Sequence, residues 1–197
     1  MQHVDPFRVF TSWFRMAVRR SPGSWFDPSA MTLATSSKSG HVTARMVLLK
    51  KFGPEGFTFY TNYGSRKAQQ LSVNPRAALV LHWPYLRRQV RIEGIVERVS
   101  REDSEGYFHS RPRLHQLAAA ASNQSERIAA RKVLLDRFKE LRKTYTTRTV
   151  PLPRNWGGYR LIPDSIEFWV HRENRLHDRL RYRREKRGGW RVERLAP

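Results

Sequence analysis

Cationic side chains in this sequence stand where a phosphate group could be held. Ser65-Arg66-Lys67 follows the aromatic segment 57–61 and opens a segment with helical spacing. The backbone N–H groups of a helix start, a hydroxyl and two cations can converge on one phosphate. Cations are poorly placed beside the positive end of a helix unless an anion is present. These residues therefore predict a phosphate site.

A second set of cations stands on a predicted strand, residues 45–50. Alternation along a strand gives two faces, which carry Arg45, Val47 and Leu49 on one side and Met46, Leu48 and Lys50 on the other. A cation at each end of this run suits an anionic ligand, and it equally suits the solvated ends of an ordinary strand.

Further along the chain, Tyr107 and Arg111 are one helical turn apart, and with Arg113 they predict a second anion site. If residues 175–179 are extended, Arg175, His177 and Arg179 share one side. Metal and nucleophile sites have little support. His171 and His177 lack the spacing of a zinc-protease pair, no third ligand stands near them, and no nucleophile-elbow motif is present.

Composition narrows the class of protein. The 197 residues carry a formal charge of +21, with 39% hydrophobic and 12% aromatic residues. A disordered basic tail is excluded, because this chain can bury a real core. The charge predicts an anionic partner such as nucleic acid, a membrane surface or a phosphorylated small molecule. With no cysteine, redox chemistry requires a borrowed cofactor. No membrane span or signal peptide is evident, which predicts a cytoplasmic protein.

The elements that would hold these residues alternate irregularly between strands and helices. Apolar periodicity and turn signals predict helices at 5–20, 64–72, 101–121 and 124–143, and strands at 30–36, 42–51, 57–61, 77–83, 89–99, 158–162, 165–171 and 190–195. Asp5 should cap the first helix, with Pro6 at its first position. Such an order favours a single α+β domain over residues 1–197, an antiparallel barrel with packed helices and a helical insert at about 101–143.

Taken in order, these motifs resemble the pyridoxine (pyridoxamine) 5′-phosphate oxidase family over nearly the whole chain. The resemblance runs from Asp5-Pro6-Phe7, through the segments 30–35 and 45–50, to the closing segment 190–197. It implies a split β-barrel that binds FMN and works as a homodimer with its active site between the subunits.

For the cofactor, the resemblance implies that Arg66 and Lys67 hold the FMN phosphate, that Gln89 contacts the isoalloxazine ring, and that Gln124 and Ser125 come from the partner subunit. The full implied FMN set is Arg45, Met46, Val47, Leu48, Leu49, Lys50, Tyr60, Thr61, Arg66, Lys67, Gln89, Gln124, Ser125, Trp169 and Arg179.

For the substrate, a phosphorylated pyridine, the resemblance implies binding by Lys50, Tyr107, Arg111, His115, Arg175, Leu176 and His177, of which Arg175 and His177 would be catalytic. The chain departs from the family pattern in three places. His115 replaces a small hydroxyl residue, Ala118-Ala119-Ala120 replaces a glycine–alanine–tryptophan pattern, and the basic segment that normally precedes Asp5 is missing.

The favoured function is oxidation of pyridoxine or pyridoxamine 5′-phosphate to pyridoxal 5′-phosphate, with release of hydrogen peroxide. A related branch of flavin oxidases, which acts on dihydrophenazine carboxylic acids, is the first alternative. It generally lacks the lysine and tyrosine that stand here as Lys50 and Tyr107. A non-enzymatic barrel that binds nucleic acid through the +21 charge is the second alternative and is not favoured. No membrane partner and no metal are expected.

Overall fold

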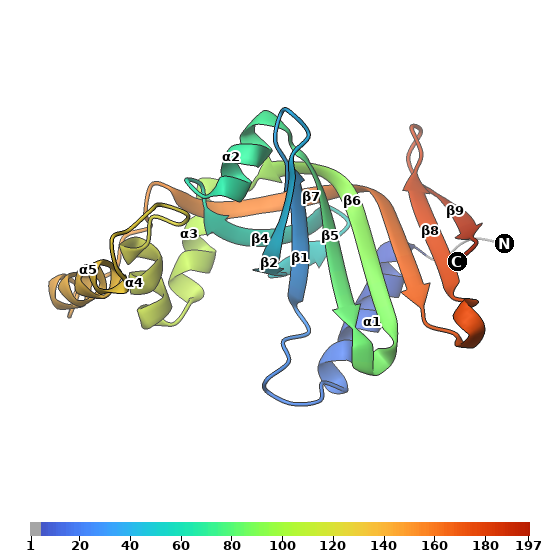
Figure 1. The fold of residues 1–197 in the computed structure, drawn as a ribbon, viewed down its shortest axis with the longest axis horizontal. Coiled ribbons are helices and arrows are strands. Elements are labelled where there is room, and N and C mark those ends of the chain that lie inside the picture. Colours follow the sequence, from blue (N-terminus) through green and yellow to red (C-terminus); the bar gives the residue numbers. More distant parts are fainter. Residues whose placement is uncertain (1–4) are drawn as a thin grey trace.

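The computed structural model describes residues 5–197, and an antiparallel sheet runs through its centre (Figure 1). The described residues form nine strands, seven of them in the order β2-β1-β5-β6-β7-β4-β3, while β8 pairs with β7 and β9. The strands are β1 (Ala30–Ser36), β2 (Val42–Leu48), β3 (Lys51–Gly53), β4 (Gly56–Asn62), β5 (Arg76–Trp83), β6 (Arg88–Arg98), β7 (Trp156–Val170), β8 (Asp178–Arg184) and β9 (Trp190–Leu195). This is the predicted α+β barrel-like class.

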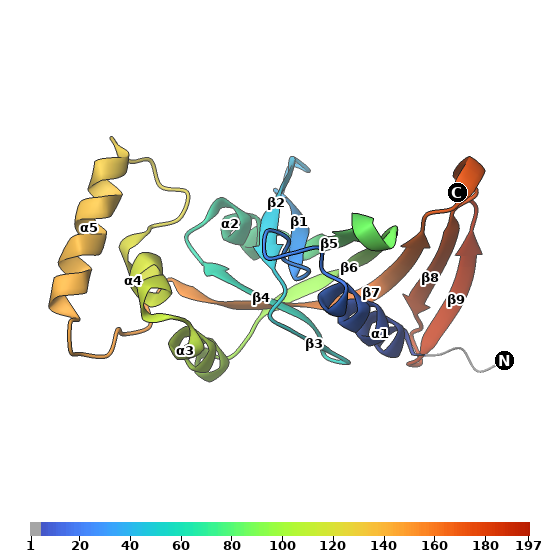
Figure 2. The same ribbon diagram turned by 90° about the horizontal axis from the view of Figure 1, so that it is seen from below.

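Five α-helices flank the sheet in the described part of the chain: α1 (Pro6–Arg19), α2 (Arg66–Val73), α3 (Arg101–Ser110), α4 (Arg113–Ala121) and α5 (Arg131–Thr144). Figures 1 and 2 place α3, α4 and α5 at one end of the molecule and the β8–β9 hairpin at the other. No helix of residues 5–197 is both long and apolar enough to cross a membrane.

Strand β7 connects the two ends. Its first half pairs with β4, its second half with β8, and β6 runs beside both. The strand has 15 residues, so at about 3.3 Å per residue its ends lie roughly 45 Å apart. Side chains at its two ends therefore belong to different regions of one chain.

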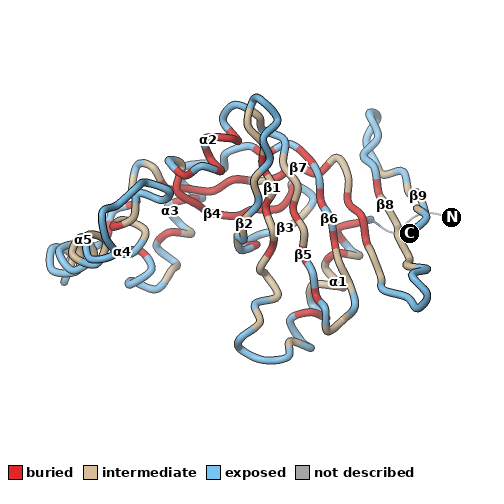
Figure 3. Tube along the Cα trace, viewed as in Figure 1, coloured by how far each residue is buried: buried red, intermediate tan, exposed pale blue. Residues whose placement is uncertain are grey.

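The main core lies where α1 packs on the sheet (Figure 3). Asp5 caps α1 as predicted, its Oδ1 accepting from the Phe7 N–H at 2.9 Å. Phe10 is fully buried and meets Phe52 and Phe57 edge to face, with ring centroids 4.8 and 5.0 Å apart. Burial of such aromatic faces drives the packing of the helix on the sheet. A second cluster joins α3 and α4 to the start of β7 through Phe108, Leu117, Val150, Leu152 and Trp156.

Two helix boundaries differ from the prediction. The helix predicted at 101–121 is broken, because Pro112 forces Arg111 into an extended conformation (φ −75°, ψ 151°). The helix predicted at 124–143 begins only at Arg131. Residues before it form a turn in which Ser125 has φ 75° and the Gln124 side chain is bound by Lys67.

Three strand predictions also need correction. The strand predicted at 42–51 ends at Leu48, and β3 starts separately at Lys51. The strands predicted at 158–162 and 165–171 are one strand, because a β-bulge in β7 absorbs the break: Pro163 pairs with Gly94 and Ser165 with Glu93, which leaves Asp164 as the extra residue. Strand β8 was not predicted, since its dense arginines conceal the alternation with Leu180 and Tyr182.

Candidate active site

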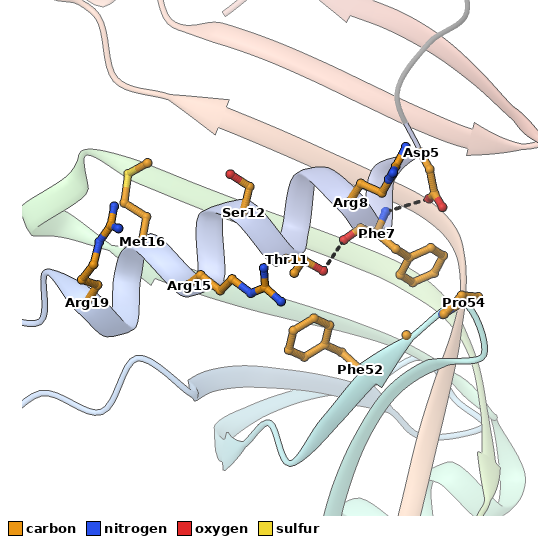
Figure 4. Close-up of a pocket in the computed structure, with 11 residues that line it drawn as sticks. Asp5, Phe7, Arg8, Thr11, Ser12, Arg15, Met16, Arg19, Phe52 and Pro54 are labelled. Atoms are coloured by element: carbon orange, nitrogen blue, oxygen red, sulfur yellow. Dashed lines mark hydrogen bonds between the residues drawn. The ribbon is translucent and has the colours of Figure 1, made fainter.

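Two large hollows exist among the described residues, and only one holds predicted site residues. The first, of about 800 Å³, runs along α1 beside Arg8, Arg15 and Arg19 (Figure 4). The hydroxyl of Thr11 in this hollow donates to the Phe7 carbonyl at 2.7 Å and is thus satisfied within its own helix. None of the predicted site residues lines this hollow.

The second hollow, of about 730 Å³, lies between β2, β4, α2, α3 and α4. Eleven predicted site residues line it: Met46, Val47, Leu48, Lys50, Tyr60, Thr61, Lys67, Tyr107, Arg111, His115 and Gln124. The sheet brings the strand residues to this face, and the helix pair α3–α4 closes it from the other side. We refer to it as the site hollow.

Among the residues that line the site hollow, Lys67 is buried with an exposed fraction of 8%. Its Nζ donates to Gln124 Oε1 at 2.7 Å, Thr61 Oγ1 at 3.0 Å and Ser65 Oγ at 3.3 Å. Burial and, to a lesser degree, the positive charge of Arg45 lower the pKa of Lys67 to about 8. All of its partners are neutral, so its charge is not balanced from within this set.

Arg45 and Arg66 do not line the site hollow, but their positive charges lie near Lys67. The pKa of Arg45 is lowered by burial and, to a lesser degree, by the nearby charge of Arg66. Among residues 5–197, no carboxylate forms an ion pair with Arg45, Arg66 or Lys67. Three mutually repelling cations without a carboxylate suit a bound dianion. We call them the cation cluster.

Gln124 and Ser125 do not come from a partner subunit, and that prediction is wrong. Gln124 accepts from Lys67 of the same chain, and Ser125 Oγ accepts from the backbone N–H of Arg66 at 3.3 Å. The segment after α4 folds back onto the start of α2, which puts both residues beside the cation cluster.

Aromatic rings support a second cation that lines the site hollow. The rings of Tyr60 and Tyr107 stack with centroids 4.0 Å apart, and the ring of Trp156 continues the stack 5.5 Å from Tyr60. The guanidinium of Arg111 lies 5.0 Å from the centroid of the Trp156 ring. Its Nη1 is buried and has no hydrogen-bond partner. A buried donor left without an acceptor costs about 1–3 kcal/mol, so this atom is suited to an anionic ligand.

Of four further predicted residues near the site hollow, Lys50 and His115 line it, whereas Leu49 and Arg113 do not. Lys50 stands exposed in the break between β2 and β3, and His115 lies in the first turn of α4. Two corrections follow. Leu49 is buried in the main core, so its side chain does not line the site hollow. Arg113 donates to the carbonyl of Arg148 at 2.8 Å instead of joining Arg111.

The remaining predicted residues gather at the far end of β7. Gln89 pairs with Trp169 across β6 and β7, and Trp169 pairs with Arg179 across β7 and β8. The ring of His177 lies 4.6 Å from the ring of Trp169. Arg179 forms a two-pronged ion pair with Glu167, at 2.8 and 3.1 Å. None of these residues lines the site hollow of the same chain.

Residues 175–179 are not extended throughout, so Arg175, His177 and Arg179 do not form the regular one-sided row that an extended segment would give. Arg175 ends a short 3₁₀ turn (Glu173–Arg175) and has φ 62°. His177 Nδ1 accepts from the backbone N–H of Arg172 at 3.1 Å. A neutral imidazole that accepts at Nδ1 carries its proton on Nε2, so His177 presents a donor at Nε2.

Comparison with known proteins places this geometry in a family. Residues 25–145 match the model described as "Pyridoxamine 5′-phosphate oxidase", and residues 156–197 match the "Pyridoxine 5′-phosphate oxidase C-terminal dimerisation region". The chain belongs to the pyridoxamine 5′-phosphate oxidase family. The predicted resemblance is confirmed.

Curated members of this oxidase family match nearly end to end. A pyridoxine/pyridoxamine 5′-phosphate oxidase of Microcystis aeruginosa is 54% identical over 98% of this chain and 89% of the relative. One of Rubrobacter xylanophilus is 51% identical over 98% of this chain and 87% of the relative. Among solved structures, PhzG of Burkholderia lata in complex with tetrahydrophenazine-1-carboxylic acid has a TM-score of 0.91 at 28% identity, covering 100% of this chain and 94% of that one.

In this member of the oxidase family, the sequence analysis missed residues that only the fold brings to the site. Trp156 carries the aromatic stack, and Asn62 holds the segment after α4 by donating to the Ser122 carbonyl at 3.2 Å. Both lie at strand ends, Asn62 on β4 and Trp156 on β7. No motif marks them, because their role depends on the pairing of two strands far apart in sequence.

Proposed function

We propose that this chain is an FMN-dependent oxidase that converts pyridoxine 5′-phosphate or pyridoxamine 5′-phosphate to pyridoxal 5′-phosphate, with oxygen as acceptor and hydrogen peroxide as by-product. With the amine substrate, one water is consumed and ammonia is released. One observation carries the proposal. Two cations line the site hollow, Lys67 of the cation cluster and Arg111, and no carboxylate of the described residues forms an ion pair with either. Two cations of this kind suit two phosphorylated ligands in one site. Membership of the family supports the same reaction.

The cation cluster suits the phosphate of FMN. Arg45, Arg66 and Lys67 would supply charge-assisted hydrogen bonds, and Thr61, Gln124 and Ser125 lie around them. The exposed side chains of Met46 and Leu48 line the same hollow and would give the flavin an apolar surface. When bound, FMN would supply the redox chemistry, accepting a hydride equivalent from the 4′ carbon of the substrate and passing two electrons to oxygen.

The surroundings of Arg111 suit the substrate phosphate. Arg111 offers its unpartnered Nη1, and Lys50, Tyr107 and His115 line the hollow beside it. The Tyr60–Tyr107–Trp156 stack holds this wall rigid. Fixing the phosphate would orient the pyridine ring, which contributes to the rate through proximity.

A second copy of the chain would complete the site. Gln89, Trp169, Arg175, Leu176, His177 and Arg179 lie toward the far end of β7, roughly 45 Å along the strand from Trp156, too far for one subunit to surround one ligand. The match of residues 156–197 to a dimerisation region supports a homodimer with its sites between the subunits. In that arrangement Arg175 and His177 of one subunit would face the reacting end of the substrate, with His177 donating from Nε2.

The test is an oxidase assay on the purified protein reconstituted with FMN, using pyridoxine phosphate, pyridoxamine phosphate and a reduced phenazine carboxylic acid. We expect a yellow protein that releases peroxide with either vitamin B6 phosphate. Turnover of the phenazine acid alone would select the related branch, to which the PhzG likeness points. A protein that binds no flavin would overturn the proposal.

A further inference from the structure

The guanidinium of Arg45 is held from behind by two threonines of neighbouring strands. Its Nη1 donates to Thr35 Oγ1 at 2.6 Å and to the Leu33 carbonyl at 3.2 Å. Its Nη2 donates to Thr43 Oγ1. Because the two threonines lie on β1 and β2, they fix the guanidinium relative to the sheet.

The direction of these hydrogen bonds identifies a third residue. Arginine only donates, so each threonine oxygen accepts from Arg45 and must donate its own proton elsewhere. Both protons go to one atom, Oε1 of Gln70, at 2.6 Å from Thr35 and 2.7 Å from Thr43. If the Gln70 amide were reversed, its Oε1 would face the His41 carbonyl oxygen, an acceptor against an acceptor. Its Nε2 donates to the His41 carbonyl at 3.4 Å, which agrees with this orientation.

Gln70 also belongs to the helix that carries the rest of the cation cluster. It follows Lys67 by three residues and Arg66 by four on α2, positions that share a face of the helix. Its side chain is buried, with an exposed fraction of 6%. The Gln70 amide thus connects Arg45 on β2 to the helix that carries Arg66 and Lys67. Because the three cations repel one another, such a connection is needed to hold them close together.

We propose that Gln70 is a positioning residue for the flavin phosphate. Through Thr35 and Thr43 it sets the Arg45 guanidinium at a fixed place relative to Arg66 and Lys67, so that the three cations meet one phosphate together. The inference rests on the proposed FMN site. The inference has a specific consequence: Gln70 should contribute to the preference of the site for FMN, which carries a phosphate, over riboflavin, which does not.

The test compares two neighbouring glutamines in the full-length chain. Gln70→Met keeps the length of the side chain and removes the shared acceptor. Gln69→Met is the matched control, because Gln69 is exposed and bonds only the Gly64 carbonyl. Dissociation constants are measured for FMN and for riboflavin by flavin fluorescence. We expect Gln70→Met to weaken FMN about tenfold, as for one misplaced charge-assisted contact, with riboflavin unchanged and Gln69→Met like wild type.

Equal weakening of FMN and riboflavin in Gln70→Met would mean a merely structural role and would overturn the inference, as would an unchanged FMN affinity. If Gln70→Met does not fold, Thr43→Val removes one arm of the same network and must show the same selective loss of FMN. A wild-type protein that binds neither flavin would overturn the proposed function, and this inference with it. A wild type that prefers FMN beside a Gln70→Met variant that keeps the full preference would overturn the inference alone.

Discussion

At the scale of single residues, the presence or absence of a carboxylate partner distinguishes structural cations from cations that are candidates for binding an anionic ligand. Arg160 pairs with Glu97 at 2.7 Å, and Arg181 pairs with Glu193 at 2.6 Å. Lys67 and Arg111 are more buried than a free surface cation would be, yet they have no acidic partner in the described chain. A desolvated charge without a counter-ion is costly, which is the physical reason to assign these residues to anionic ligands.

Lys67 should make FMN binding depend on pH. Its pKa is lowered to about 8 without ligand, and a phosphate favours the charged ammonium. Above pH 8 the ammonium is lost from the free protein, so binding must take up a proton and FMN affinity should fall by up to about tenfold per pH unit. Titrations with FMN from pH 7 to 9.5 measure this. Lys67→Arg should bind with a flat profile over the same range, and a flat wild-type profile would contradict the assignment.

At the scale of elements, backbone geometry at a few positions decides where site residues fall. Pro112 separates α3 from α4 and turns Arg111 toward Trp156. The bulge at Asp164 of β7, opposite Glu93 and Gly94, lets β6 follow β7 past Pro163, so that β7 remains continuous from Trp156 to Trp169. The helix start and the strand pattern were readable in the sequence. The bulge could not be predicted, because the close approach of Gly94 to the Ile162 carbonyl arises only when β6 and β7 pair.

Gly94→Ala should destabilise the fold. A Cβ at this position would overlap the Ile162 carbonyl oxygen, which is backbone and cannot move aside cheaply. We expect a loss of about 2–4 kcal/mol in the free energy of unfolding, measured by urea denaturation. Gly106→Ala is the control, since nothing lies within 4 Å of its added Cβ on exposed α3. It should stabilise by about 0.5–1 kcal/mol. Equal stability of the two variants would disprove the role of the bulge.

At the scale of the whole molecule, the predicted site residues of one chain form two groups toward opposite ends of β7, which in the proposed homodimer would be two half-sites. The α3–α5 end and the β8–β9 end lie apart (Figures 1 and 2). Helices α3 and α4 contribute to the lining of the site hollow, and Trp169 and His177 lie beside β8. The charge of +21 is spread far beyond these half-sites. Only a minority of the basic residues has a proposed ligand, and the cytoplasmic location stays a prediction.

Mixed dimers test the sharing of sites. Arg111→Gln damages the half-site of the helical end, and the double variant Arg175→Gln, His177→Ala damages the other, so each homodimer should be inactive. After unfolding and refolding together, roughly a quarter of wild-type activity should return, because half of random dimers are mixed and each holds one intact site. Oxidase activity measures the recovery. No recovery, with mixed dimers present by native mass spectrometry, would rule out sites shared between subunits.

By itself the sequence determined the fold class, the capped first helix, the family and most of the residues that line the site hollow. These depend on local patterns and on motifs that are read along the chain. Only the tertiary structure decided that Gln124 serves its own subunit, that Leu49 faces the core, and that Gln70 joins Arg45 to α2. Those facts depend on contacts between residues far apart in sequence, and the local pattern of residue types does not determine which distant residue a side chain contacts.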